Sequence, residues 1–245
     1  MVDPIRPNVQ PGGFYSSQEL KHDIQVHSAA VRAAIESMDV FIFTLGLTEC
    51  WVSKQDGTVF PLPPGVAGGV WDPNDTHFRN FTLEETTADL QNAIELIRSI
   101  NPEVKIILTV SPVALNATFE RRHVLLSTTW SKAVLRLAAE ELTNRFDNLI
   151  YFPSYEIITS PHSRGRYFSE DCRSVTQGGV DHVMRVFLKH FSTIPEEKRN
   201  QTSRPAPVEQ PFDENVEMAI SAFCDEELLD NTAPETKDST ICHAN

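Results

Sequence analysis

The chain has few cysteines, and their positions follow no pattern. Only four of the 245 residues are cysteine, namely Cys50, Cys172, Cys224 and Cys242, and no two are spaced as Cys-x-x-Cys. Closely spaced cysteine pairs mark many structural zinc sites, and a regular set marks the disulfide framework of small secreted domains. The sequence therefore favours free thiols in a reducing compartment, and it predicts no metal site.

Long hydrophobic runs and basic stretches are also missing. No run approaches the ~18 apolar residues of a membrane span, and the segment after Met1 lacks the basic and apolar regions of a secretory leader. We therefore expect a cytoplasmic protein without a membrane span. The net charge is −13. Because no stripe of Lys and Arg could neutralise phosphates, a nucleic-acid partner is not expected.

Glycine-rich phosphate loops are absent as well. The chain has ten glycines but neither Gly-x-Gly-x-x-Gly nor Gly-x-x-x-x-Gly-Lys-Ser/Thr. These loops bind phosphates through closely approaching backbone N–H groups. Their absence disfavours a nucleotide-binding domain, and the sequence predicts no cofactor.

The acidic charge that is present is concentrated at one end. From Ser192 to Asn245 there are twelve Asp and Glu against four Lys and Arg, a net charge of −8. Apolar residues are sparse there apart from Val216–Phe223. Such a composition buries too little apolar surface to fold, so we expect one domain over 1–191 and a mostly disordered tail over 192–245.

Short apolar runs alternate with helical patterns in the first 191 residues. Apolar spacing predicts helices near 17–38, 83–99, 124–146 and 180–191, and buried strands near 40–46, 105–110 and 149–153. Strands that alternate with helices indicate an α/β fold with a doubly wound, mostly parallel sheet. The long stretch 54–81, rich in Pro, Gly, Asp and Asn, is expected to be a loop.

Ligands of parallel α/β sheets bind beyond the carboxyl ends of the strands. The segments 46–51, 111–113 and 153–156 follow the three predicted strands. They are the candidates for a common cleft, although convergence at this edge specifies no reaction.

Four phrases along the chain resemble successive blocks of the GSCFA family. They occur in family order at 43–49 (Phe-Thr-Leu-Gly-Leu-Thr-Glu), 108–113 (Leu-Thr-Val-Ser-Pro-Val), 131–138 and 151–157. The resemblance implies an SGNH/GDSL-like hydrolase fold, a three-layer flavodoxin-like sandwich. It also implies an esterase or acyltransferase that acts on acyl groups of a carbohydrate or surface polymer.

The resemblance assigns the oxyanion and substrate-binding side to residues after the first two strands. Gly46 matches a glycine whose N–H stabilises an oxyanion, and Thr48, Glu49 and Ser111 stand beside it in the blocks. Each also has a structural alternative. Gly46 equally suits a tight turn, Glu49 a solvated or capping carboxylate, and Ser111 before Pro112 a turn.

The catalytic blocks depart from the family pattern. The Gly-Ser-Cys-Phe-Ala segment that carries the nucleophile does not occur, so we expect the first strand to be missing and the chain to be truncated or degenerate. Asp171 matches the family aspartate, although it could equally cap the final helix or a turn, and Ser174 stands where the base histidine belongs. His182 lies about two helical turns further on. His123 and His162 are substitutes that no pattern singles out.

The alternative to an enzyme is therefore a non-catalytic binding or accessory module of the same fold. Trp71, His77, Phe78 and Asn80 in the long predicted loop form a mixture suited to stacking against a sugar and hydrogen-bonding it, or simply to packing the loop on itself. Lys132, in a predicted helix, is expected to be a surface or ion-pairing group.

Overall fold

The computed structural model describes residues 1–66 and 69–192. The predicted tail over 192–245 therefore lies outside the described residues except for Ser192, and its predicted disorder stays a prediction. Cys224 and Cys242 lie outside them too.

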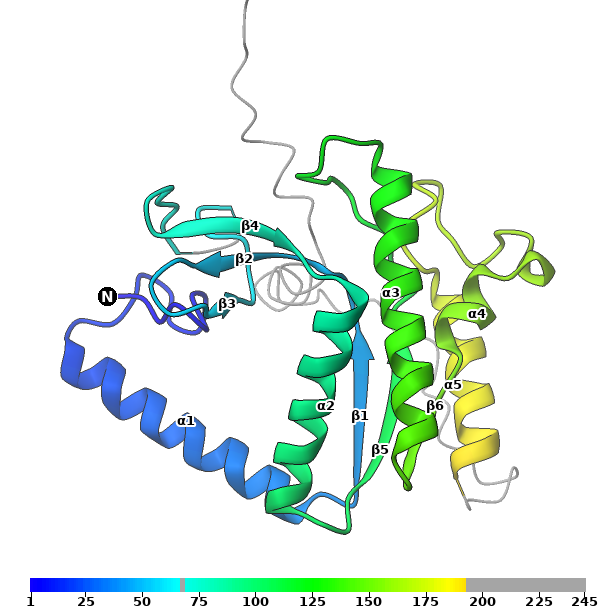
Figure 1. Ribbon diagram of the computed structural model, residues 1–245, viewed down its shortest axis with the longest axis horizontal. Helices are drawn as coiled ribbons and strands as arrows, with labels where there is room; N and C mark the ends of the chain where they lie inside the picture. Colours follow the sequence, from blue (N-terminus) through cyan, green and yellow to red (C-terminus); the bar gives the residue numbers. More distant parts are fainter. Residues whose placement is uncertain (67–68, 193–245) are drawn as a thin grey trace, which may run out of the picture.

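Helices and strands alternate along the described chain as the sequence predicts (Figure 1). The elements are α1 (Ser17–Ser37), β1 (Val40–Leu45), β2 (Glu49–Ser53), β3 (Val59–Phe60), β4 (Thr76–Asn80), α2 (Leu83–Ile100), β5 (Lys105–Val110), α3 (Val124–Arg145), β6 (Leu149–Tyr151), α4 (Ser154–Thr159), the 3-10 helix η1 (Pro161–Ser163) and α5 (Gln177–Phe191).

The three predicted strands form one parallel sheet in the order β1-β5-β6. Leu108 and Val110 of β5 are completely buried, as expected for a central strand between helical layers. They share a core with Leu90 of α2 and Leu142 of α3, which cover one face (Figure 1). Thr109 points to the opposite face, where its hydroxyl lies 2.5 Å from that of Ser154 in α4. The predicted α/β fold is confirmed.

Side-chain caps explain where the helices begin. Ser16 caps α1 by accepting from the N–H of Glu19, and Thr82 forms a reciprocal capping box with Glu85 at the start of α2. Thr176 caps α5 by accepting from the N–H of Gly179. The four long predicted helices are confirmed with small shifts at their ends.

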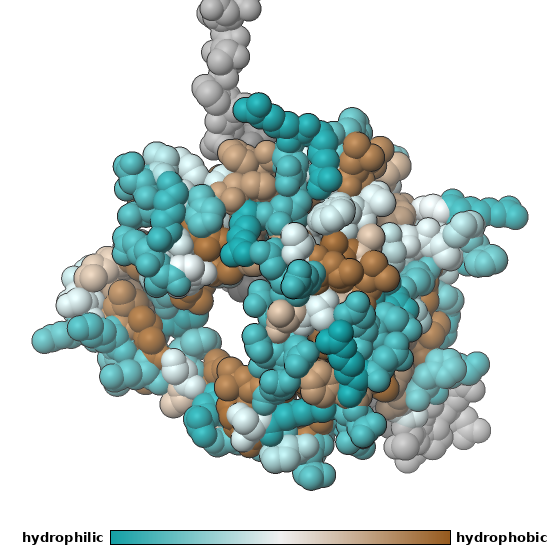
Figure 2. All heavy atoms as spheres, viewed as in Figure 1, coloured by the Kyte–Doolittle hydropathy of each residue, from teal (hydrophilic) through white to brown (hydrophobic). Residues whose placement is uncertain are grey.

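One prediction about β1 is wrong. Its apolar sequence predicts cover on both faces, but β1 is an edge strand in which Val40, Ile42 and Phe43 are 45%, 50% and 38% exposed. In the described part of the chain no strand pairs with its outer edge. Helix α1 lies apart from β1, and Leu20 is the only buried residue of this helix. Figure 2 shows an opening between the α1 side of the molecule and its body.

The prediction of a loop over 54–81 is also wrong in part, because two segments of this stretch are strands of a second sheet. Strands β3 and β4 pair with β2 in an antiparallel sheet of order β3-β2-β4. Trp51 stands opposite Phe60 on one side and Phe78 on the other. Strand β3 is too short to leave a periodic pattern, and β4 mixes polar and aromatic residues, so long-range pairing rather than local sequence creates this sheet.

Candidate functional site

The carboxyl ends of β1 and β5 lie side by side. Leu45 is in register with Val110, and the N–H of Ser111 donates to the carbonyl of Leu45 at 2.9 Å. Gly46 and Ser111 are therefore neighbours at one rim of the parallel sheet, as the sequence predicts. At the adjacent strand end the N–H of Phe152 donates to the carbonyl of Leu108 at 2.8 Å.

The backbone of Gly46 is fixed on both sides. The carbonyl of Leu45 points towards β5, and the peptide that joins it to Gly46 is trans. Because the N–H of a trans peptide points opposite to its C=O, the N–H of Gly46 points away from β5, towards the open edge of β1. No hydrogen bond joins this N–H to another described residue. The rim thus presents one outward-facing backbone donor.

Lys132 of α3 fixes the next peptide, and its predicted surface position is wrong. Its Nζ donates to the carbonyl of Gly46 at 2.8 Å, and the residue is only 2% exposed. The long apolar stem allows a lysine to lie among core residues while its ammonium group reaches a backbone carbonyl at the rim. The sequence gives no signal for this, because the acceptor lies 86 residues away.

Thr48 joins the second sheet to α3. Its hydroxyl lies 2.7 Å from both Asn80 Oδ1 and Ser131 Oγ, and its N–H donates to Ser131 Oγ at 3.2 Å. Asn80 in turn donates to Glu120 at 3.1 Å. Thr48 is 2% exposed and Ser131 is 0% exposed. This polar network holds β2 and β4 against the helix that carries Lys132.

Glu49 is engaged by the loop that precedes α3. Its Oε1 accepts from the Thr118 hydroxyl at 2.6 Å, and its Oε2 accepts from the N–H of Phe119 at 3.3 Å. The Thr118 hydroxyl also lies 2.8 Å from Ser127 Oγ in α3. The carboxylate is thus neither free nor a helix cap, and it positions the loop beside the rim.

Asp171 and Ser174 lie together in a tight turn before α5. Asp171 accepts from the N–H groups of Arg173 and Ser174 at 2.9 Å each and from the Ser174 hydroxyl at 2.5 Å. The Ser174 hydroxyl, followed by these two N–H groups, lowers the pKa of Asp171. Arg173 Nε donates to the carbonyl of Ala114 at 2.9 Å, which joins the turn to the segment after Ser111.

His182 is not part of that turn. It lies in α5, where its ring stacks on Tyr167 with centroids 5.3 Å apart and its Nδ1 lies 2.6 Å from the guanidinium of Arg185. His123 caps α3 by accepting from the N–H of Leu125, and His162 is exposed in η1. The two serines that the sequence places in the site have other partners: Ser174 Oγ donates to Asp171, and Ser111 Oγ accepts from the N–H of Val113.

Ser111 has a structural partner, and the two described cysteines differ in their exposure. Ser111 Oγ accepts from the N–H of Val113 at 3.2 Å, which is the turn geometry that the sequence allows. Burial raises the pKa of Cys50 to about 11, so this thiol stays protonated at neutral pH. Cys172 is exposed. No group of three His, Cys, Asp or Glu side chains in the described ranges is arranged to hold a metal ion.

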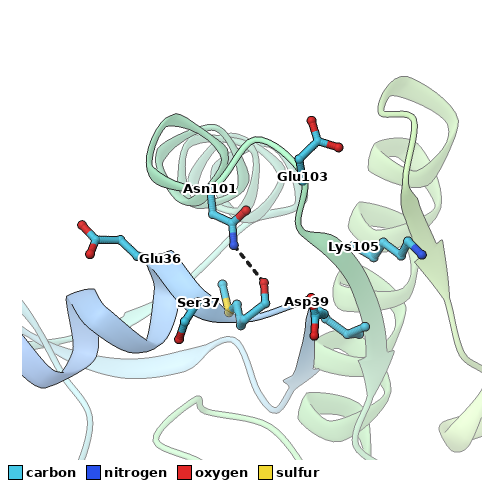
Figure 3. Close-up of a pocket in the computed structure, with 8 residues that line it drawn as sticks. Glu36, Ser37, Asp39, Asn101, Glu103 and Lys105 are labelled. Carbon is cyan, nitrogen blue, oxygen red and sulfur yellow. Dashed lines mark hydrogen bonds between the residues drawn. The ribbon is translucent and has the colours of Figure 1, made fainter.

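A cavity of about 250 Å³ lies at the other end of the sheet (Figure 3). Asn101 points into it and donates to the carbonyls of Ile35 and Met38 at 2.9 and 2.8 Å. The lining comprises Glu36, Ser37, Met38, Asp39, Val40, Asn101, Glu103 and Lys105. Val40 and Lys105 begin β1 and β5, so this cavity is at the amino ends of the strands, opposite the rim of Gly46 and Ser111.

The fold and the rim define the class: an α/β domain with a parallel sheet and polar segments gathered at its carboxyl edge. The model of the GSCFA family matches residues 7–187, and the chain belongs to this family. No curated protein matches the chain. Among the described helices, none is both long and apolar enough to cross a membrane.

Proposed function

We propose that the rim around Gly46 binds an acyl ester of a carbohydrate or related surface polymer, the substrate class of an SGNH-like esterase or acyltransferase. The observation that carries the proposal is the outward-pointing N–H of Gly46, held by the hydrogen bonds at Leu45 and at its own carbonyl. A preorganised backbone N–H stabilises the negative charge that develops on an acyl carbonyl oxygen. Thr48 and Glu49 shape this donor's surroundings through the polar contacts that position β2 and the loop before α3.

We further propose that the described residues bind the ester without hydrolysing it. Acyl transfer by a serine needs a hydroxyl hydrogen-bonded to a base. Asp171 and Ser174 form a turn with no histidine in it, and His182 is paired with Arg185. The arrangement therefore favours the non-catalytic binding module over the active esterase for this chain.

Ester binding is tested by the backbone NMR signal of Gly46 in the full chain. We expect acetylated xylohexaose to shift this amide proton downfield, and fully deacetylated xylohexaose to leave it in place. The Gly46→Ala variant establishes the assignment, because it removes the glycine signal. A Cβ at this position has no atom within 4 Å, so the fold should persist. An unmoved Gly46 signal at saturating ester would refute the binding role.

Catalysis is tested separately with p-nitrophenyl acetate and acetylated glycans. We expect the same background rate from the wild-type chain and from its Glu49→Ala and Asp171→Ala variants. A kcat/KM of about 10⁴ M⁻¹ s⁻¹ or more for the wild type, the lower end for ordinary enzymes, would contradict the non-catalytic assignment.

A further inference from the structure

Four aromatic rings gather on one face of the β3-β2-β4 sheet and the loop before α3. We call this the aromatic patch, and it consists of Trp51, Trp71, Phe78 and Phe119. Trp51 is at its centre, with ring centroids 4.7 Å from Trp71, 5.6 Å from Phe78 and 4.9 Å from Phe119. The interplanar angles are 76°, 68° and 69°, so the rings pack edge to face and hold one another in place.

The patch remains open to solvent although its rings are ordered by contact. Trp71 is 42% exposed and Phe119 is 65% exposed. Such exposure of large rings usually marks an interaction site, because burying them elsewhere would stabilise the fold. Glu49 fixes Phe119 through its N–H and through Thr118, so part of the rim network positions an exposed ring.

The patch adjoins the proposed ester-binding rim. Trp51 lies five residues beyond Gly46, so a fully extended chain would separate them by at most about 17 Å. Glu49 points to the same face of β2 as Trp51, because side chains two residues apart in a strand share a face. A polymer bound at the patch would therefore reach the rim within a few units.

The size of the patch decides between a small ligand and a protein partner. Aromatic side chains offer roughly 150–250 Å² each, so the exposed fractions amount to about 400 Å² at most. A stable protein interface needs about 800 Å² per partner. An acyl chain would also bind weakly at the patch, because much of its apolar surface would stay in water on so open a surface. A sugar ring suits the site better, since one face stacks on an aromatic ring while its hydroxyls remain hydrated.

We propose that the aromatic patch is a binding subsite for a neutral sugar unit. The statement that this sugar belongs to the acylated polymer rests on the proposed function of the rim. The statement that a sugar stacks on the patch does not depend on that function. The acidic chain, at −13, disfavours a strongly anionic glycan.

The test measures binding of three neutral oligosaccharides to the full chain by calorimetry and tryptophan fluorescence: xylohexaose and mannohexaose without O-acetyl groups, and chitohexaose, whose acetyl groups are amides rather than esters. We expect at least one to bind, and its Kd to rise about tenfold or more in Trp71→Ala and in Phe119→Ala, the change that losing one stacked ring produces. Trp130→Ala is the matched control. Trp130 is 43% exposed, nearly the same as Trp71, but it lies on α3 outside the patch, and we expect no change in Kd.

Three results would overturn the proposal: no binding of any of the three at millimolar concentration, equal effects of Trp71→Ala and Trp130→Ala, or self-association that Trp71→Ala abolishes. The last would assign the patch to a second copy of the chain. These sugars carry no ester, so the two proposals fail separately. Absence of sugar binding would refute the patch proposal but not ester binding at Gly46, and an unmoved Gly46 signal would refute ester binding but not the patch proposal. Phe119→Ala provides a second variant if Trp71→Ala does not fold.

Discussion

Replacing Thr48 with valine tests whether the polar network stabilises the rim. Valine keeps the shape of threonine but removes the hydroxyl that lies 2.7 Å from Asn80 Oδ1 and 2.7 Å from Ser131 Oγ. A buried hydrogen bond contributes about 0.5–1.5 kcal/mol, so losing two lowers the free energy of unfolding by roughly 1–3 kcal/mol. Water cannot replace them readily, because Thr48 is 2% exposed and Ser131 is 0% exposed.

The assay is urea unfolding followed by tryptophan fluorescence and far-UV circular dichroism. Thr129→Val is the control, because Thr129 is exposed and its hydroxyl donates only to the carbonyl of Leu125 in its own helix. We expect that control to change stability by less than about 0.5 kcal/mol.

A double-mutant cycle with Ser131→Ala isolates the contact between the two hydroxyls. If the 2.7 Å contact is a hydrogen bond, the stability losses of Thr48→Val and Ser131→Ala are not additive, and the coupling is about 0.5–1.5 kcal/mol. Additive losses, within about 0.3 kcal/mol, would refute a hydrogen bond between the two hydroxyls.

The remaining predictions concern a buried cation, a buried thiol and an exposed carboxylate. Lys132→Met should lower the free energy of unfolding by about 1.5–3 kcal/mol in the same assay, because the hydrogen bond from a charged donor to the Gly46 carbonyl is lost; unchanged stability would contradict this. With its pKa raised to about 11, Cys50 should add nothing to fast thiol labelling at pH 8, so Cys50→Ser should leave the fast amplitude unchanged while Cys172→Ser lowers it. Folding lowers the pKa of Asp171 from its ordinary value of 3.8. The hydrogen bonds of its carboxylate therefore stabilise the turn fully at pH values above 3.8, and this stabilisation is lost as the pH falls through the lowered pKa. NMR signals of the turn amides should therefore titrate below pH 3.8 in the wild type and stay constant in Asp171→Asn.

The open edge of β1 bears on the prediction that a first strand is missing. The carbonyls of Asp39 and Leu45 accept from β5, so by alternation the backbone groups of Ile42 point outwards. No described residue pairs with that edge, and residues 1–16 form no strand. An uncharged, exposed edge of this kind is a site for pairing with another strand. The prediction itself stays a prediction.

Much of the fold could be predicted from the sequence. Helix α2 has a strong periodic apolar pattern and strand β5 a continuous one, and both lie where those patterns place them. The position of Gly46 and Ser111 at one rim follows from a general rule for parallel sheets. These features depend on local pattern and on topology, both of which the residue order carries.

The rest of the candidate site could not be predicted in the same way. From the sequence, Asp171 could be either a catalytic carboxylate or a turn residue. In the structure it is a turn residue, because it accepts a hydrogen bond from the Ser174 hydroxyl. Glu49 had several possible partners, and only the structure pairs it with Thr118, 69 residues away. For such polar side chains the partner depends on which distant segment packs nearby.

The amino-acid sequence by itself determined the alternation of helices and strands, the parallel α/β class and the rim at the strand ends, because the period and length of apolar runs select them. Only the tertiary structure decided that β1 is an edge, that Lys132 is buried against Gly46, and that Trp51 gathers three other rings on a second sheet. The physical reason is that exposure, strand pairing and ring contacts arise between residues far apart in the chain, and local periodicity carries no information about such pairs.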